Sequence, residues 1–360
     1  MSRFFSEKYR CLTPYTPGEQ PRDTSFIKLN TNESPYPPSD KVLSAVSSEA
    51  EKLMLYSDPQ AKLLTEKLAK RFEVLPENVI VGNGSDEILN FCFMSFFDTG
   101  VVFPDITYGF YPVYATLCGI PYREIPLKED FTVDIGEYVG IGENIVIANP
   151  NAPTGILISL FDIERVVKSN PDKIVLIDEA YIDFGGESAI PLTKKYSNLI
   201  VVGTFSKSRS MAGARLGFAI ANKALISDLN TVRYSTNPYN VNRMTLAAGC
   251  AAIDDDSYYI DNCKRIEESR DYIEKELLKR AFSVTDSKAN FVFASSDKIT
   301  GEELYSSLRK KGILVRHFDK ERIKNHNRIT VGRMEDMKKL ISAIDEILKE
   351  KENEKRENKS

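Results

Sequence analysis

The chain has 360 residues, enough to bury a full hydrophobic core and to form roughly two or three domains. Its 48 basic and 52 acidic residues are mixed along most of the sequence and give a net charge of -4, which excludes the basic stripe typical of nucleic-acid-binding proteins. The five cysteines are odd in number and widely spaced without any CxxC pair, so we expect reduced thiols and a cytoplasmic protein. This composition is compatible with an enzyme that acts on small molecules.

No segment predicts export or membrane insertion. The most apolar stretch, residues 88–97, is interrupted by Asn90 and Ser95 and is too short to span a bilayer, and the N-terminus lacks the apolar core of a signal peptide. The only histidines are His317 and His326, so the sequence offers few candidate residues for a metal site built from histidines or for a Ser-His-Asp triad. We therefore expect neither a membrane partner nor a bound metal.

The first two thirds of the chain predict an α/β domain. Asp58 and Pro59 are interpreted as the N-cap and first-turn proline of a helix whose apolar residues recur at helical spacing up to residue 72. From about residue 78 to 220, short β-branched runs alternate with helical or loop segments, and their continuous apolar character indicates strands buried on both faces. These runs cover residues 79–81, 100–103, 144–147, 174–177 and 199–202. Polar, glycine or proline residues follow each run, which places the candidate chemistry at the carboxyl ends of the strands.

After about residue 256 the pattern changes to long charged helices and short strands. We expect helices at about 257–281, 300–311 and 334–351 and strands at 291–293 and 328–331, which indicate a smaller α+β domain. From residue 349 onward the chain is almost wholly charged or polar, and we expect this tail to fray into solvent. The predicted division is an N-terminal arm at 1–44 that joins the small domain and the active site, a large domain at 45–255, a small domain at 256–350 and a charged tail at 351–360.

The most informative residue is Lys207, which directly follows one of the apolar runs. Hydroxyl side chains frame it and Arg215 follows eight residues later, an arrangement that suggests a Schiff-base lysine beside a phosphate site. Asp178 and Tyr181 follow a second apolar run, and one cofactor ring could contact the carboxylate and the phenol of these residues together. The combination predicts pyridoxal phosphate.

Three motifs, in matching order and spacing, resemble the fold-type I pyridoxal phosphate aminotransferases: Asn149-Pro150-Asn151-Ala152-Pro153-Thr154-Gly155, Asp178-Glu179-Ala180-Tyr181, and Ser206-Lys207 with Arg215. A finer signature resembles the histidinol-phosphate aminotransferase family and extends the match over residues 12–345. It consists of Leu12-Thr13-Pro14-Tyr15, Leu29-Asn30-Thr31-Asn32-Glu33, Tyr56-Ser57-Asp58-Pro59, Gly82-Asn83-Gly84-Ser85-Asp86-Glu87 and Asn327-Arg328-Ile329-Thr330-Val331-Gly332. The resemblance implies an α/β fold with a large domain, whose mostly parallel sheet is flanked by helices and binds pyridoxal 5'-phosphate, plus a smaller α+β domain.

Within this family resemblance, four side chains are assigned to the cofactor ring. Lys207 would form the Schiff base and carry the Cα proton, and Asp178 would keep the pyridinium nitrogen protonated so that the ring accepts electrons. Tyr181 would hydrogen-bond the phenolic oxygen of the cofactor, and Tyr108 would stack on the ring.

The cofactor phosphate is expected where a helix opens with Ser85 and Asp86, because free backbone N–H groups and the positive end of the helix dipole suit an anion. Ser206 adds a hydroxyl, and Arg215 adds a guanidinium fork that can clamp the same phosphate. The resemblance also places Tyr56 across a dimer interface, where it reaches the phosphate held by the other subunit. It thus implies an obligate homodimer with shared active sites.

Two positions depart from the family pattern. Many aminotransferases have an asparagine directly before Pro-Thr-Gly that binds the phenolic oxygen of the cofactor, whereas this chain has Ala152 there and Asn151 one step earlier. We assign Asn151 to the cofactor site, with its bond to that oxygen left open. Tyr56 is followed by Ser57 where proline is usual, which leaves the approach of that tyrosine less rigid.

The predicted substrate site consists of Tyr15, Asn32, Arg316 and Arg328. Arg328 resembles the anion-binding arginine of aminotransferases, and Arg316 could join it with Tyr15 around a substrate phosphate, although a structural salt bridge is the alternative for Arg316. The implied reaction interconverts L-histidinol phosphate and 2-oxoglutarate with imidazole-acetol phosphate and L-glutamate in histidine biosynthesis.

Three other functions stay open at this point. An aromatic or broad-range amino-acid aminotransferase would use Arg328 for a carboxylate as readily as for a phosphate. A lyase similar to threonine-phosphate decarboxylase shares the phosphate and lysine groups and differs in which Cα bond is aligned with the π system of the ring. A non-catalytic regulatory module that only binds the cofactor is disfavoured by the presence of Lys207, Asp178 and Arg215 together.

Overall fold

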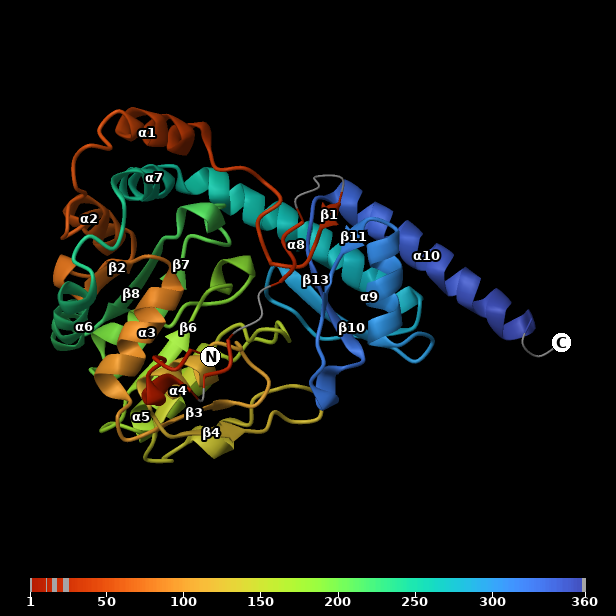
Figure 1. The fold of residues 1–360 in the computed structure, drawn as a ribbon, viewed down its shortest axis with the longest axis horizontal. Helices are drawn as coiled ribbons and strands as arrows, with labels where there is room; N and C mark the ends of the chain where they lie inside the picture. Colours follow the sequence, from red (N-terminus) through yellow and green to blue (C-terminus); the bar gives the residue numbers. More distant parts are fainter. Residues whose placement is uncertain (1, 11, 15–17, 22–25, 358–360) are drawn as a thin grey trace.

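The computed structural model describes residues 2–10, 12–14, 18–21 and 26–357. Within these ranges the larger sheet has seven strands in the order β2-β8-β7-β6-β5-β3-β4 (Figure 1). In that order the strands are Val79–Gly82, Gly217–Ala221, Leu199–Thr204, Val175–Asp178, Asn144–Ala148, Val101–Pro104 and Tyr122–Ile125. β8 runs antiparallel to its neighbours β2 and β7, and the other pairs are parallel. The sheet is therefore mostly parallel, as predicted.

Helices cover both faces of this sheet. Along β5, Ile145 and Ile147 face one apolar core, while Val146 between them faces the other, as the two-residue period of a strand requires. The first core lies under α2 (Lys62–Arg71), α5 (Leu160–Ser169) and α7 (Arg243–Asp254), and the second lies under α3 (Ser85–Phe96), α4 (Tyr111–Cys118) and α6 (Lys223–Thr236). Burial on both faces explains why these strands have continuous apolar runs.

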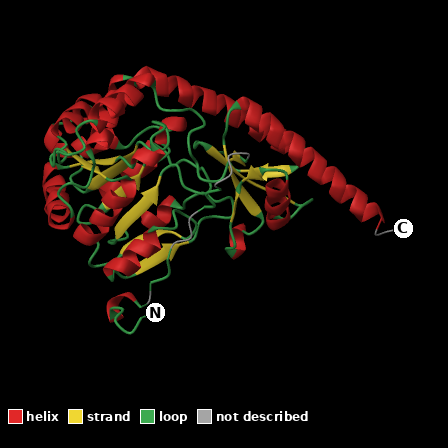
Figure 2. Cartoon of the chain, turned by 45° about the horizontal axis from the view of Figure 1, so that its top comes forward, coloured by secondary structure: helices red, strands yellow, loops and turns green. Residues whose placement is uncertain are grey.

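A long helix, α8 (Asp256–Lys279), leads from the large sheet into a second, smaller unit (Figure 1). Its antiparallel sheet has the order β12-β13-β10-β9, formed by Arg316–His317, His326–Thr330, Phe291–Ser296 and Phe282–Val284. α9 (Gly301–Lys310) and α10 (Met334–Glu357) join α8 around a separate apolar core. Figure 2 shows the strands in two groups, with α10 extending past the smaller one. In the described parts of the chain, no helix is both long and apolar enough to cross a membrane.

The N-terminal segment connects the two units. β1 (Ile27–Lys28) pairs in parallel with β11 (Ile313–Leu314) of the small unit. The chain then continues to α1 (Asp40–Ala50), which contributes Val42 to the core of the large sheet. The boundary predicted at residue 44 therefore falls inside α1.

Two element ends differ from the prediction. The helix expected at Pro59 begins only at Lys62, because Ala61 has a left-handed φ of 48°, and Asp58 Oδ2 accepts the N–H of Lys62 at 2.8 Å. The charged tail does not fray from residue 349, since α10 continues to Glu357. Its last turns are rich in Glu, Lys and Arg, which are good helix formers.

Candidate active site

The predicted catalytic segments follow two neighbouring parallel strands. β6 ends at Asp178, whose Cα lies opposite Val202 of β7, and the loop after β7 carries Ser206 and Lys207. Lys207 Nζ lies 5.6 Å from the centre of the Tyr181 ring and donates to the Thr31 carbonyl at 3.3 Å. The structure therefore brings together the lysine and the tyrosine that were predicted to share one cofactor ring.

Asp178 is almost completely buried at the end of β6. Its Oδ2 accepts the hydroxyl of Tyr111 at 2.9 Å, and its Oδ1 accepts the N–H of Ala180 at 3.3 Å. Burial raises the pKa of Asp178 to about 6, while the hydrogen bond from Tyr111 acts in the opposite direction. A buried carboxylate of this kind is well suited to pair with a protonated ring nitrogen.

The predicted phosphate site lies where α3 begins. Gly84 precedes the helix and provides no side-chain cap, so the first N–H groups of Ser85 and Asp86 remain available to an anion. Arg215 Nη2 contacts Asp86 Oδ2 at 2.9 Å, and its Nη1 lies 3.5 Å from Ser206 Oγ. The glycine at 217 allows β8 to pass this helix end, since a Cβ there would lie 2.3 Å from the Ser85 nitrogen.

Tyr108 approaches the same helix end from the other side. Its hydroxyl donates to Asp86 Oδ1 at 2.7 Å, so the Asp86 carboxylate connects Tyr108 with Arg215. Ser85, Asp86, Ser206 and Arg215, which were predicted for the phosphate, are thus neighbours at the start of α3, in the loop after β7 and just before β8. With the buried carboxylate and the lysine, they form a donor set that fits pyridoxal phosphate.

A cavity of about 450 Å³ extends from this region toward the small unit. Its walls include the predicted residues Lys207, Tyr181, Tyr108, Asn32, Arg316 and Arg328. Asn32 Nδ2 donates to the Tyr181 hydroxyl at 3.0 Å, while its backbone N–H donates to Thr330 Oγ1 at 2.9 Å. Asn32 therefore contacts the phenol that was predicted to bind the cofactor and also holds the N-terminal segment against β13.

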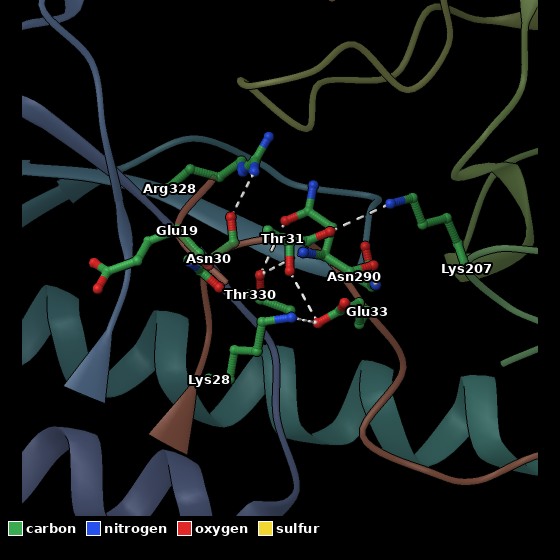
Figure 3. A network of polar contacts seen from close by, with 10 residues as sticks. Glu19, Lys28, Asn30, Thr31, Glu33, Lys207, Asn290, Arg328 and Thr330 are labelled. Carbon is green, nitrogen blue, oxygen red and sulfur yellow. Dashed lines mark hydrogen bonds and ion pairs between the residues drawn. The ribbon is translucent and has the colours of Figure 1, made fainter. Parts of the chain in front are cut away.

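The two arginines lie directly opposite each other on the adjacent strands β12 and β13. Arg328 Nη2 donates to the Asn30 carbonyl at 2.9 Å (Figure 3), and its guanidinium lies 5.9 Å from the ring centre of Phe318. The Arg316 guanidinium lies 5.8 Å from the same ring. Two positive groups on one cavity wall suit a divalent or carboxylate anion.

Among the predicted residues that the structure describes, Asn151 and Tyr56 have side chains engaged away from Lys207. The Asn151 side chain is engaged elsewhere, because its Nδ2 donates to the Ile106 carbonyl at 2.9 Å and its Oδ1 accepts the Thr107 hydroxyl at 2.8 Å. Ala152, not Asn151, lines the cavity. Tyr56 is 80% exposed and stacks on Tyr239 with ring centres 4.6 Å apart. Tyr15 lies outside the described residues.

The residue that the sequence analysis missed is Tyr111. Its hydroxyl contacts Asp178 although 67 residues separate the two in the sequence. The available signal was its position three residues after Tyr108, in the turn that leads into α4, where the Tyr111 N–H donates to the Tyr108 carbonyl at 3.2 Å.

Comparisons with known proteins show the family to which this chain belongs. Residues 24–344 match the family described as aminotransferase class I and II. The chain is 49% identical to a histidinol-phosphate aminotransferase of Brachyspira hyodysenteriae, covering 97% of this chain and 100% of that protein. It is 46% identical to histidinol-phosphate aminotransferase 1 of Bradyrhizobium diazoefficiens, with the same coverage of both chains.

Solved structures show the same fold. The histidinol-phosphate aminotransferase of Sinorhizobium meliloti, solved with pyridoxal-5'-phosphate, has a TM-score of 0.87 at 22% identity and covers 97% of this chain and 99% of its own. The corresponding enzyme of Clostridium acetobutylicum has a TM-score of 0.83 at 25% identity and covers 90% of this chain and 99% of its own.

Fold and site together define a pyridoxal phosphate-dependent aminotransferase of class I and II. This confirms the predicted fold, enzyme class and cofactor. At 46 to 49% identity over nearly its whole length, the chain belongs to the histidinol-phosphate aminotransferase family.

Proposed function

We propose that the protein transfers the amino group of L-histidinol phosphate to 2-oxoglutarate, and catalyses the reverse reaction, in histidine biosynthesis. The observation that carries this proposal is a single cavity with Lys207 on one wall and the Arg316 and Arg328 pair on another. A substrate with an amine at one end and a phosphate at the other matches that separation of chemical groups.

The residues of the candidate site would have separate roles in transamination. Pyridoxal 5'-phosphate, when bound, supplies an aldehyde for the substrate amine and a ring that takes up the electrons released at Cα. Lys207 Nζ, close to Tyr181, would take up and return the proton at the substrate Cα. Asp178 would hold the proton on the ring nitrogen, and Arg215 with the α3 N-terminus would bind the cofactor phosphate.

The arginine pair determines which amino donor is accepted. Arg316 and Arg328 bind the phosphate of histidinol phosphate, whereas Arg328 alone suffices for the carboxylate of glutamate in the second half of the reaction. Phe318, which packs against both guanidinium groups, limits the positions that they can adopt.

Rates with different amino donors test the proposal. Single-turnover loss of the cofactor's visible absorbance is measured with L-histidinol phosphate, L-glutamate and L-phenylalanine. We expect the specificity constant to be highest for L-histidinol phosphate. If the protein does not react with L-histidinol phosphate but reacts with L-phenylalanine, it is a broad-range aminotransferase. If it releases carbon dioxide from a phosphorylated amino acid, it is a lyase.

The same proposal includes a cytoplasmic homodimer in which residues 45–255 and 256–350 act as the large and small domains. An exposed apolar segment, Leu53-Met54-Leu55-Tyr56, supports the dimer, because such a run is unusual on the surface of a monomer. Cys92, Cys118, Cys250 and Cys263 are free thiols, which is consistent with a reducing compartment.

A further inference from the structure

Tyr111 is the first residue of α4, and its hydroxyl lies against the carboxylate of Asp178. The tyrosine is fully buried, and burial together with the nearby Asp178 charge raises its pKa well above the usual value. The phenol therefore stays protonated and is the donor in the 2.9 Å hydrogen bond to Asp178 Oδ2. With the Ala180 N–H on Oδ1, this bond sets the orientation of the carboxylate.

The surrounding aromatic side chains hold Tyr111 in place. Its ring packs edge-on against Tyr108, with ring centres 5.6 Å apart, and in a tilted arrangement against Phe103, with ring centres 5.8 Å apart. Tyr108 donates in turn to Asp86 at the start of α3. Tyr108 and Tyr111, on either side of the turn that leads into α4, thus contact the two carboxylates at opposite ends of the predicted cofactor site.

We propose that Tyr111 is a positioning residue, whose hydroxyl aims the Asp178 carboxylate at the ring nitrogen of pyridoxal phosphate and favours its charged form. The inference rests on the cofactor part of the proposed function and is independent of the identity of the amino donor. The physical reason is that a buried carboxylate loses its water shell, and a hydrogen bond to the charged form replaces part of it.

The charged and titratable groups around Asp178 define the expected pH dependence. Burial is the main cause of the raised pKa of Asp178; Asp86 on α3 raises it further, whereas Tyr111 on α4 and Lys207 on the loop after β7 lower it. Removing the Tyr111 hydroxyl is expected to raise the pKa of Asp178 above its present value of about 6. As the pH is lowered, the affinity for the cofactor should then begin to fall at a higher pH than in the unchanged protein. The reason is that the protonated carboxyl cannot pair with a charged ring nitrogen.

The test is a double-mutant cycle on cofactor affinity. Apoprotein carrying Tyr111→Phe, Asp178→Asn or both is titrated with pyridoxal 5'-phosphate between about pH 5.5 and 8.5, and Kd is read from cofactor absorbance. We expect Tyr111→Phe to raise Kd about 10-fold at pH 7.5, the loss associated with one hydrogen bond to a charged group. In the Asp178→Asn background the same change should alter Kd by less than about 2-fold, because Tyr111 acts through the charge of Asp178.

Tyr138 provides a matched control. It is also fully buried, and within the described residues its hydroxyl has no hydrogen-bond partner, so Tyr138→Phe should leave Kd unchanged. Circular dichroism and Tm confirm that each variant is folded. The inference is overturned if Tyr111→Phe behaves like Tyr138→Phe, or if it costs as much affinity with Asn at 178 as with Asp. Failure of the unchanged protein to bind pyridoxal phosphate would instead contradict the proposed function.

Discussion

Lys207 extends from the loop after β7 toward the N-terminal segment, where its Nζ donates to the Thr31 carbonyl (Figure 3). The hydrogen bond is 3.3 Å long and is made to a neutral group. Among the residues that the structure describes, no carboxylate forms an ion pair with Lys207, so its side chain can turn toward a ligand, as a residue that forms a Schiff base must do.

Replacing this lysine separates covalent chemistry from binding. We expect Lys207→Ala to abolish transamination while some noncovalent cofactor binding is retained through Arg215 and the α3 N-terminus. Borohydride reduction of the cofactor-loaded protein, followed by peptide mapping, should place the label on Lys207. Lys168→Ala on the exposed face of α5 is the control and should leave both label and turnover intact. A label on any other lysine would contradict the assignment.

The arginines on β12 and β13 predict how the substrates are discriminated. Losing one charge-assisted contact costs about 1.5 to 3 kcal/mol, or roughly 10- to 150-fold in specificity constant. We expect Arg316→Ala to lower kcat/KM for histidinol phosphate by that amount and for phenylalanine by less, while Arg328→Ala should affect both donors.

A control in the same domain is Arg280→Ala, which removes a guanidinium held by Glu276 and Asp345 on α8 and α10. It should not change the ratio of the two specificity constants. Equal losses for both donors in Arg316→Ala would mean that Arg316 does not recognise the substrate phosphate and would favour the broad-range aminotransferase.

At the scale of elements, five strands of the large sheet were predictable from their apolar runs, and β4 and β8 were not. The apolar runs of β2, β3, β5, β6 and β7 correspond to observed strands, because both faces of each are covered by helices. β4 (Tyr122–Ile125) was missed, since it lies at the sheet edge and three of its four residues are exposed. β8 was missed because its short run begins with Gly217 directly after the phosphate-binding loop, where the local sequence resembles a turn.

The contacts of Glu179 with the segment before η5 are expected to make the free energy of unfolding depend on pH. Glu179 lies directly after β6 and is buried. Its Oε2 accepts the Ser188 hydroxyl at 2.5 Å, and its Oε1 accepts the Ala189 N–H at 2.6 Å. Ser188 and Ala189 directly precede the 3-10 helix η5 (Ile190–Lys194). Burial raises the pKa of this carboxyl from 4.5 to about 8, and the two hydrogen bonds oppose the shift. The folded state therefore binds this proton more tightly than the unfolded state does.

The sign of the effect follows from the raised pKa. The contribution of protonated Glu179 to the free energy of unfolding is fully present below about pH 4.5 and is lost as the pH rises through about 8. Within this range the free energy of unfolding falls by up to about 1.4 kcal/mol per pH unit. Glu179→Gln removes the titration and keeps an acceptor, so the Tm of the apoprotein should fall less between pH 6 and about 8.5 than in the unchanged protein. Glu187→Gln, which alters an exposed carboxyl of the same loop, should follow the unchanged protein. Parallel slopes for Glu179→Gln and the unchanged protein would show that Glu179 does not carry this pH dependence.

At the scale of the whole molecule, the site depends on contacts that local sequence patterns cannot reveal. The loops after β6 and β7 could be placed together because the ends of neighbouring parallel strands meet at one sheet edge. The Asn32 contacts with Tyr181 and Thr330 join residues 149 and 298 positions apart, and they follow only from the path of the N-terminal segment between the two units. Tyr111 was missed for the same reason, because nothing near it in sequence marks Asp178 as its partner.

The exposed position of Tyr56 is explained if a second copy of the chain completes the site. Arg243 holds this segment from within the chain, because its Nη1 donates to the carbonyl oxygens of Leu55 and Tyr56 at 3.3 and 3.0 Å, while the Tyr56 side chain itself is 80% exposed. The backbone is thus anchored and the phenol is directed away from the core. Such an arrangement suits a residue that serves a neighbouring subunit.

Mixing two inactive variants tests this directly. If Tyr56 crosses to the other subunit, a mixed dimer of Lys207→Ala and Tyr56→Ala chains contains one site that lacks both groups and one site that is fully native. Each parent dimer has the same lesion in both of its sites, so activity should appear on mixing and should rise to about half that of the unchanged protein per mixed dimer. Subunit exchange is followed independently with two differently tagged chains, and Lys207→Ala mixed with Asp178→Asn is the matched control. In that control both lesions stay within their own chains, so neither site is native and activity should not return. Exchange without recovery of activity in the Tyr56 pair would mean that Tyr56 acts within its own chain or not at all.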